Sequence, residues 1–400
     1  MTQTSPAIST KGRIDAFFGL SLHIIGVVFL ARFIMDIGNR MMFPFIPQFS
    51  LGLGLTIAGF GWLLFIHGLV GLVGPIFGIW SDRYGRRQTM AIGMGLQAVG
   101  LAGLALTWQW WATMPLILTG LGVAAFLPAQ QAYISDQVPY QKRGRAIASV
   151  EFAWSMSAIV ALPIIGWMID AFGWRLPLLV VGLISLGGAL LVWWQLPPTT
   201  GRHVQASPSW VATKNVFLTG NVMAAVSVAL LVFVAASIFI TVWGIWLSEE
   251  FKFDATTLGW VGTAVGVAEL AGAGLSSLFI DRIGKKRGSE WAILLLVVTF
   301  LLLPLTQNTA AIVAIATLVI LGIVFEFTIV SLIPLFSEQV PAARGTVLSL
   351  TYLGIGIGSA IAPPITTTLW ERFGLGAVCA AAAACLLLAF GLTWKFLHEH

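Results

Sequence analysis

The chain has 400 residues, of which 58% are hydrophobic and 9% are charged, with a formal net charge of +5. Soluble domains carry about 25% charged residues, so this composition suits lipid as the surrounding solvent and excludes a large soluble catalytic domain. At roughly 20 apolar residues per membrane-spanning helix, the chain has room for about twelve spans.

Apolar runs separated by polar residues, glycine and proline predict two sets of six helices. The first six cover residues 17–46, 57–80, 89–106, 111–134, 145–169 and 176–196. The last six cover residues 216–247, 256–280, 291–305, 310–336, 345–370 and 375–397. The longest polar stretch lies between the two sets. We therefore predict an N-terminal six-helix bundle over 1–196, a cytoplasmic central linker over 197–215 and a C-terminal six-helix bundle over 216–400.

Lysine and arginine lie mainly on one side of these spans. With the N-terminus in the cytoplasm, sixteen of the 21 cations fall on the cytoplasmic side and only Arg175, Lys252 and Arg372 on the other. This positive-inside bias predicts a multi-pass protein of the cytoplasmic membrane with both termini in the cytoplasm. Because the positive charge is spread over several short loops, it reports topology, and we expect no nucleic-acid partner.

Several short motifs occur once in each half of the chain. Ser-Asp-Gln-Val-Pro at 135–139 returns as Ser-Glu-Gln-Val-Pro at 337–341. Beyond it, Pro163 corresponds to Pro364, and Asp170 to Glu371, at a constant spacing of 201 residues. Six helices per half is an even number, so both halves enter the membrane from the same side. The sequence therefore predicts two parallel repeats related by an axis along the membrane normal.

The loop between the second and third predicted helices carries a glycine-containing basic motif. It reads Gly-Ile-Trp-Ser-Asp-Arg-Tyr-Gly-Arg-Arg at 78–87, and a degenerate copy, Ser-Leu-Phe-Ile-Asp-Arg-Ile-Gly-Lys-Lys, lies at 277–286. The first copy resembles the GxxxDRxGRR signature of the major facilitator superfamily, and the helix count and the central linker extend the resemblance over essentially the whole chain. It implies an all-α membrane fold of twelve helices in two parallel six-helix pseudo-repeats, working by alternating access.

The resemblance also implies a conformational gate in these loops. Its predicted residues are Gly78, Asp82, Arg83, Gly85, Arg86, Arg87, Arg143, Asp281, Arg282 and Arg344. Gly78 is expected to let a neighbouring helix approach closely, and Gly85 to permit a tight turn. Asp82 is expected at the N-terminus of the eleventh helix, near Gly345, where the helix dipole favours an anion. The arginines would pair with acids across the cytoplasmic mouth; the alternative is that they only enforce topology.

Ionisable residues inside the predicted spans mark function by default, because each is costly in a membrane. The third, sixth, ninth and twelfth helices carry none over 89–106, 176–196, 291–305 and 375–394, which matches the outer supporting helices of the superfamily fold. The remaining helices would enclose the cavity. The residues predicted for the substrate or proton pathway are Arg32, Asp36, Arg40, His67, Glu269, Glu326, Trp154, Trp243 and Trp246.

Arg32, Asp36 and Arg40 recur every four residues and therefore share one helix face. They either form a self-neutralising ladder or line a cavity, where they would bind a polar substrate group or pass a proton through Asp36. Two cations around one anion leave a net charge, which favours the cavity. Glu269 and Glu326 lie mid-helix among apolar residues and are predicted as proton carriers, unless each balances an arginine of the first helix.

His67, Glu151 and the tryptophans each allow two interpretations. His67 either titrates in the pathway or is a hydrogen-bonded packing residue. Glu151 lies near the cytoplasmic end of the fifth helix and is expected to partner the loop cations Arg143 or Arg145. Most of the 17 tryptophans lie near helix ends, as an interfacial belt requires. This leaves the three tryptophans of the predicted pathway as cavity aromatics.

The predicted function is proton-coupled efflux of a small amphiphilic organic compound, because the 400-residue length and short linker resemble the bacterial efflux-type branch. Two departures weaken assignment to the drug–proton antiporters. Leu116 occupies the position where those proteins carry an arginine, and the fifth helix retains only Pro163 and Gly166 of their glycine–proline run. The alternative is proton-coupled uptake of a small organic anion, with Arg32 and Arg40 clamping a carboxylate or phosphate.

Other function classes find little support in the sequence. A membrane-embedded enzyme needs a nucleophile with a base or a metal cluster, and neither HExxH nor GxSxG occurs. Cys379 and Cys385 share one apolar run and predict neither a disulfide nor a metal site. We therefore expect a non-enzyme without cofactor or metal, whose partners are a small-molecule substrate, the proton and the lipid bilayer, and which is monomeric. A receptor or scaffold that keeps the fold remains the non-transporting alternative.

Overall fold

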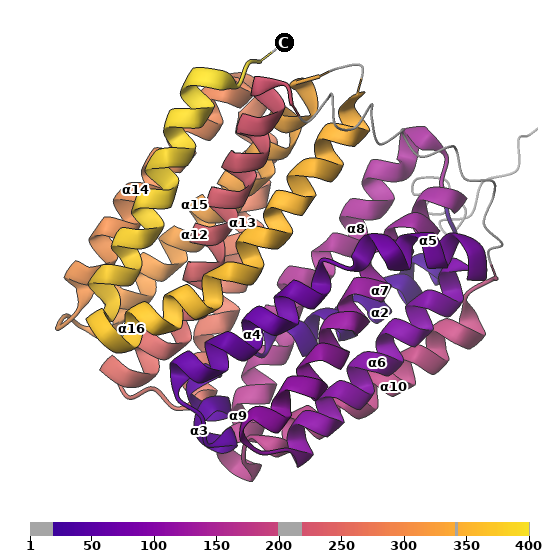
Figure 1. Cartoon of the computed structure of the whole chain (residues 1–400), viewed down its shortest axis with the longest axis horizontal. Helices are drawn as coiled ribbons and strands as arrows, with labels where there is room; N and C mark the ends of the chain where they lie inside the picture. The colour runs from indigo at the N-terminus through magenta and orange to yellow at the C-terminus, as the bar shows by residue number, and fades with distance from the viewer. Residues whose placement is uncertain (1–18, 199–217, 341–342, 400) are drawn as a thin grey trace, which may run out of the picture.

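The computed structural model describes residues 19–198, 218–340 and 343–399, except the side chains of Tyr140 and Asp281. Within these ranges every regular element is a helix. Figure 1 shows two bundles, with α2 to α10 in indigo to magenta and α12 to α16 in rose through orange to yellow. The predicted linker over 197–215 falls almost wholly outside the described residues, so the domain boundaries stay a prediction.

Twelve spans can be traced in the described part of the chain. Ten segments are long and apolar enough to cross a membrane. One of them, α16 (Arg344–Phe396), is two helices, because Gly374 has the non-helical angles φ 73° and ψ −167°. The predicted second span is divided into α4 (Ile57–Gly71) and α5 (Gly74–Tyr84), each too short to cross a membrane alone. The predicted all-α, twelve-helix membrane fold is thus confirmed.

The first half follows the predicted order, but several helices are interrupted. Its other elements are α2 (Leu22–Arg40), α3 (Ile46–Leu53), α6 (Arg86–Leu106), α7 (Thr113–Gln137), α8 (Arg143–Met156), α9 (Leu162–Phe172) and α10 (Arg175–Gln195). The predicted first helix over 17–46 ends early, and the chain turns over 41–45 before α3. The fifth span contains a π-helical turn at Ser157–Ala161, just before Pro163. Proline has no amide hydrogen to donate, so the regular helical pattern is disrupted there.

The second half contains α12 (Gly220–Glu250), α13 (Ala255–Ile283), α14 (Lys285–Leu302), α15 (Ala311–Glu338) and α16. Most predicted boundaries agree within a few residues. The ninth helix differs most, since it begins at Lys285 and not at residue 291. Gly284, with φ 93°, ends α13, and α14 starts at the next residue.

The helices predicted to be free of charge lie on the outside. Figure 1 shows α6 and α10 at the outer side of one bundle, and α14 with the C-terminal half of α16 at the outer side of the other. Side chains on these helices, such as Trp194 and Leu388, are exposed. Apolar exposed side chains on outer helices suit a surface that faces lipid.

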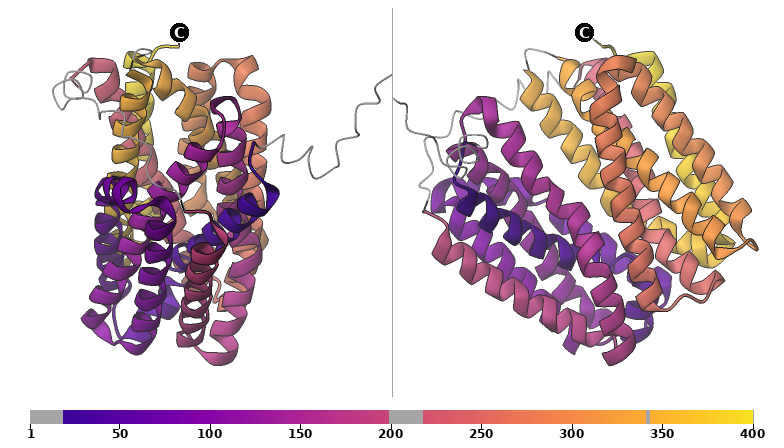
Figure 2. Two further views of the ribbon diagram at one scale, coloured as in Figure 1. Left: turned by 90° about the vertical axis from the view of Figure 1, so that its right-hand side faces the viewer. Right: turned by 180° about the vertical axis from the view of Figure 1, so that it is seen from behind.

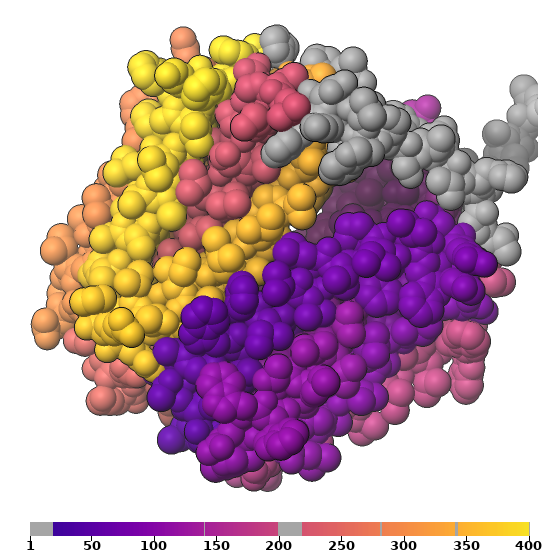
Figure 3. Space-filling view, viewed as in Figure 1, coloured from indigo at the N-terminus to yellow at the C-terminus, as the bar shows by residue number. Residues whose placement is uncertain are grey.

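The two bundles are packed tightly at one end and part at the other. We call the end with the 78–87 loop and the C-terminus the motif face, and the opposite end the far face. Figure 2 shows the bundles diverging toward the C-terminus. Near the far face, a Cβ atom added to Gly166 on α9 would lie 2.1 Å from the carbonyl oxygen of Ala255 on α13. Figure 3 shows the surface hollowed between the indigo and gold helices toward the motif face.

Candidate functional site: a charged cavity between the halves

A buried ion pair joins the two halves at the centre of the molecule. Arg40, the last residue of α2, donates from Nη2 to Oε1 of Glu269 on α13 at 2.7 Å. The two side chains are only 7% and 2% exposed. Arg40 also donates from Nη1 to the carbonyl oxygen of Trp154 at 3.2 Å, and its guanidinium lies 4.6 Å from the centre of the Trp154 ring. Each half therefore supplies one hydrogen-bond acceptor to Arg40.

Arg32 lies two helical turns before Arg40 and has three polar partners. Its Nε donates to both oxygens of Asp36, at 2.8 and 2.9 Å. Its Nη1 donates to Glu151 at 3.0 Å and to Gln130 at 3.3 Å. The sequence predicts Arg143 or Arg145 as the partner of Glu151, but it does not predict this contact with Arg32. Since Glu151 is on α8 and Gln130 on α7, Arg32 holds three helices of the first half together.

The acids of this region outnumber the bases. Together with Glu326 on α15, these residues form what we call the central cluster: Arg32, Asp36, Arg40, Glu151, Glu269 and Glu326. Oε2 of Glu269 is buried without a hydrogen-bond partner. Glu326 is half-buried and close enough to Glu269 and Arg40 to be affected by their charges. Four carboxylates thus face two guanidiniums. Uncompensated charge within a membrane protein is costly, which makes this excess of acids a candidate for function.

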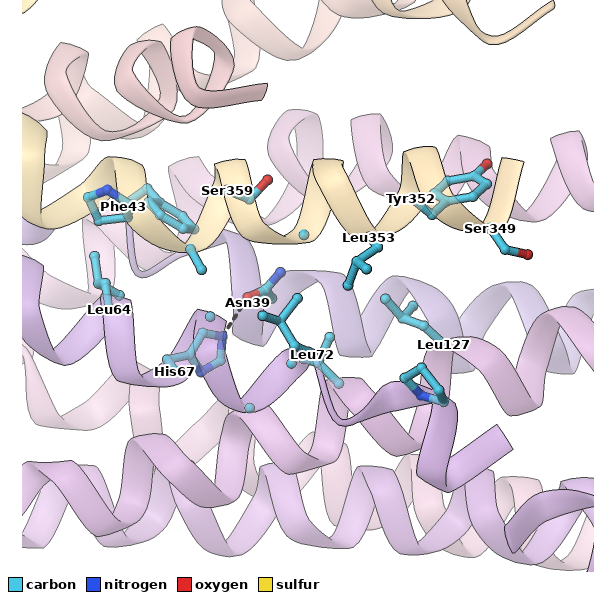
Figure 4. Close-up of a pocket in the computed structure, with 18 residues that line it drawn as sticks. Asn39, Phe43, Leu64, His67, Leu72, Leu127, Ser349, Tyr352, Leu353 and Ser359 are labelled. Atoms are coloured by element: carbon cyan, nitrogen blue, oxygen red, sulfur yellow. Dashed lines mark hydrogen bonds between the residues drawn. The ribbon is translucent and has the colours of Figure 1, made fainter. Parts of the chain in front are cut away.

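A pocket of about 450 Å³ opens between the halves next to the central cluster. His67 of α4 lies in its wall, with Nε2 at 3.1 Å from the Asn39 side-chain oxygen (Figure 4). Its Nδ1 lies 3.1 Å from the Thr119 hydroxyl. The carbonyl oxygen of Leu116 lies 3.2 Å from the same Nδ1. Both ring nitrogens are therefore engaged, which supports the interpretation of His67 as a hydrogen-bonded packing residue.

The opposite wall of this pocket comes from α16. Ser349, Tyr352 and Ser359 add three hydroxyl groups, while Leu72 and Leu353 are among the apolar residues of the lining (Figure 4). Apolar walls with a few polar groups are typical of sites for small organic molecules. Because both halves line it, the pocket would change shape whenever the halves move.

The structure brings two of the three predicted cavity tryptophans to the central cluster. Trp154 lies against Arg40, and Trp243 lines a small enclosed space together with Arg40 and Glu269. Trp246 does not belong there. It lies one turn closer to the far face, is fully buried, and packs edge-on against Phe251 with ring centres 5.7 Å apart. Trp246 therefore lies in the core of the second half in this structure, and its part in the pathway stays a prediction.

The loop motif of the first half is built around Arg86. Gly85, with φ 103°, connects α5 to α6 as a single residue, a conformation that favours glycine. Arg86 pairs with Asp82 on α5 and with Asp136 on α7 at 3.2 Å. In the second half, Lys285 pairs with Glu338, the residue that corresponds to Asp136. The ion pairs around the two motifs therefore repeat, as the sequence correspondence predicts.

The gate differs from expectation in three respects. A Cβ atom at Gly78 would have no atom of the described residues within 4 Å, so none of the described helices approaches it closely. Asp82 is bound by Arg86, and among the described residues it makes no hydrogen bond to the N-terminus of α16. The ion pairs of Arg86 lie within one half and do not cross the mouth. All three follow from the separation of the halves at the motif face.

The other predicted gate residues are dispersed. Arg83 lies over the Tyr84 ring. Arg87 donates to the Leu196 carbonyl oxygen at 3.2 Å, and Arg143 donates to the Val138 carbonyl oxygen at 3.0 Å. The side chains of Arg282 and Arg344 are exposed. The side chain of Asp281 lies outside the described residues.

Sequence analysis missed two neutral residues that the structure places at the site. Gln130 is fully buried and receives a hydrogen bond from Arg32, and Asn39 is a hydrogen-bond partner of His67. Both interrupt apolar runs of predicted spans, and such a polar residue within a span indicates a candidate site residue. Neither residue is ionisable or aromatic, and the predicted pathway contains only residues of those two kinds.

Comparison with known proteins agrees with this architecture. The sequence profile of the Major Facilitator Superfamily matches residues 28–244 and again residues 225–400. The chain belongs to the major facilitator superfamily. It is therefore a membrane transporter by family, with the twelve-helix fold described above.

Proteins similar to this chain carry names that indicate different transport activities. Solute carrier family 22 member 18 of Rattus norvegicus is 23% identical over 89% of this chain and 89% of its own length. A multi-drug resistance efflux pump PmrA homolog of Lactococcus lactis is 23% identical over 90% of this chain and 83% of its own. Among solved structures, a D-xylose–proton symporter superposes with a TM-score of 0.75 at 19% identity, covering 94% of this chain and 98% of the symporter. The last likeness concerns the fold alone.

Proposed function

We propose that this transporter exports a small amphiphilic organic compound in exchange for protons. The observation that carries the proposal is the buried Arg40–Glu269 pair, which bridges the halves close to the carboxyl group of Glu326. Among the described residues, Oε2 of Glu269 has no hydrogen-bond partner. The multi-drug efflux pump of Lactococcus lactis, at 23% identity, supports the direction of transport. The largely apolar pocket next to His67 supports an amphiphilic cargo.

The geometry suggests how a proton would be coupled to the conformational change. In this structure the motif face is open, and Arg40 and Glu269 pair on the far-face side of the cavity. Opening the far face must move α2 away from α13, which would leave two buried charges unpaired. A proton bound by Glu269 removes its negative charge and lowers that cost. Glu326 lies close enough to Glu269 and Arg40 to be affected by their charges, so it is suited to pass the proton or to hold it.

Uptake of an organic anion is less well supported by the same contacts. Arg32 is occupied by Asp36 and Glu151, and Arg40 by Glu269. An anion that bound either guanidinium would have to displace a carboxylate and would add charge to a cluster already rich in acids. This arrangement favours a proton or a cation over an anion.

The proposal places the motif face in the cytoplasm. Loop cations there, including Arg86 and Lys285, fit the positive-inside rule. The protein would then be a monomeric transporter of the cytoplasmic membrane, with both termini in the cytoplasm and the cavity open to the cytoplasm.

A ligand screen followed by a direction assay tests this function. The purified protein would be heated with amphiphiles (ethidium, rhodamine 6G, tetraphenylphosphonium) and with anions (benzoate, nicotinate) at two pH values, since a substrate stabilises the state it binds. We expect an amphiphile to raise the unfolding temperature. In inside-out membrane vesicles with an acidic lumen, the same compound should accumulate.

The opposite pattern would replace this function with uptake. If right-side-out vesicles accumulate labelled benzoate or nicotinate under an inward proton gradient, and Arg40→Ala abolishes this, the protein is an importer of organic anions. Vesicles from cells that lack the protein serve as the control.

A further inference from the structure

Two acids that correspond in the two repeats bind helix N-termini across the far face. Asp170, near the end of α9 in the first half, accepts hydrogen bonds from the backbone amides of Ala255 and Thr256 at 3.2 and 2.7 Å. It also accepts one from the Thr256 hydroxyl at 2.6 Å. These amides belong to the first turn of α13, in the second half. Glu371 in α16 likewise accepts a hydrogen bond from the Ala58 amide, in the first turn of α4, at 2.8 Å.

The two contacts agree at the second residue of the receiving helix. Each receiving helix has its own cap, since Asp254 accepts from the amide of the third residue of α13, Thr257, and Thr56 accepts from that of α4, Gly59. The amide of the second residue is in each case left to an acid from the opposite half. Hydrogen bonds from Thr257 also hold the pKa of Asp254 below its usual range. The first four amides of a helix have no partner within the helix, and its N-terminus attracts negative charge.

Close packing behind each contact holds the acid in place. On α9, Gly166 lies one turn before Asp170, and a Cβ there would be 2.1 Å from the Ala255 carbonyl oxygen. At the other crossing, a Cβ on Gly61 of α4 would be 2.0 Å from the hydroxyl of Thr367, which lies one turn before Glu371. At both crossings the helices can lie this close together only because the residues in contact are small.

We propose that Asp170 and Glu371 hold the far face closed, as a symmetric pair of caps that each half supplies to the other. When the far face opens, α13 moves away from α9 and α4 from α16, and both helices lose a charged cap. The pair thus sets the equilibrium between the state open at the motif face and the state open at the far face. This inference rests on the alternating access of the proposed function, but on neither its proton nor its direction.

Both acids are exposed, so their replacement is not expected to prevent folding. Cysteines introduced at Leu106 and Leu305, which are exposed at the far ends of the two halves, would carry spin labels in a Cys379→Ala, Cys385→Ala background. Pulsed electron spin resonance on the protein in lipid nanodiscs, with no ligand added, then measures the distance between the labels. Removing either acid should raise the ratio of far-open to far-closed molecules about fivefold, and removing both by about the product.

The matched controls are Asp254→Ala and Thr56→Ala. They remove a cap from the same helices, but one that comes from the same half. We expect them to lower the unfolding temperature without changing the distance distribution, whereas Asp170→Asn, which keeps an acceptor oxygen, should give a smaller shift than Asp170→Ala.

The proposal is overturned if Asp170→Ala, Glu371→Ala and the double variant all keep the wild-type distance distribution, or if the same-half controls shift it equally. Because no substrate and no proton gradient enter this experiment, its failure leaves the efflux proposal standing. Conversely, a transporter with another cargo would still show the shift.

Discussion

Replacing Arg40 with alanine is expected to destabilise the protein and to abolish transport. Glu269 would stay buried, 2% exposed, with neither oxygen paired. Removing one partner of a buried ion pair costs about 3–5 kcal/mol. A bias of that size between the two conformations changes their populations by at least about 100-fold. We therefore expect proton-driven transport to fall by about two orders of magnitude and the unfolding temperature to drop.

The double variant Arg40→Ala, Glu269→Gln separates stability from function. It removes both charges of the pair, so the unfolding temperature should recover toward the wild-type value while transport stays lost. Arg287→Ala is the control, because Arg287 is exposed and belongs to neither the predicted gate nor the central cluster. An Arg40→Ala protein that unfolds at the wild-type temperature and transports normally would show that the pair has no part in the cycle.

Glu326→Gln is expected to separate substrate movement from proton movement. The substitution keeps the size and polarity of the side chain but removes the group that binds a proton. Coupling free energies in proteins are about 1–3 kcal/mol, which corresponds to changes of roughly 5- to 150-fold. We expect accumulation driven by a pH gradient to fall at least about tenfold, and its dependence on pH to flatten. Exchange of labelled for unlabelled substrate, which needs no net proton movement, should continue.

Glu290→Gln provides the matched comparison for this variant. Glu290 is also a partly buried glutamate of the second half, but it lies on α14 and its basic neighbour is Lys286, at 3.9 Å. The Glu290→Gln variant should accumulate and exchange substrate as the wild-type protein does. Gradient-driven accumulation at the wild-type level in Glu326→Gln would exclude Glu326 as the coupling group.

Much of the fold could be predicted from the sequence, because lipid imposes simple requirements on the chain. Spans must be apolar and long, and charges must lie on helices that enclose the cavity. The helix interruptions were harder to locate. The break before α5 and the π-helical turn before Pro163 depend on how neighbouring helices replace missing backbone hydrogen bonds.

The candidate site could be predicted as a set of residues but not as a set of pairs. The sequence indicates that Arg40 and Glu269 are buried, yet they are far apart in the chain and meet only through the docking of the halves. The sequence predicts that Glu151 partners loop cations near it in the chain, whereas the structure pairs it with Arg32 on another helix. Asp82 illustrates a third limit. Its predicted contact with the eleventh helix requires a closed motif face, and the structure is open there.

Simultaneous recording of proton and substrate fluxes tests the central claim most directly. Proteoliposomes would contain a pH-sensitive dye and the amphiphile that gives the greatest stabilisation in the screen. The account predicts that substrate leaving through wild-type protein is accompanied by protons moving the opposite way, and that Glu326→Gln vesicles show no such proton movement. Substrate efflux without any change in luminal pH, or with protons moving in the same direction as the substrate, would contradict it.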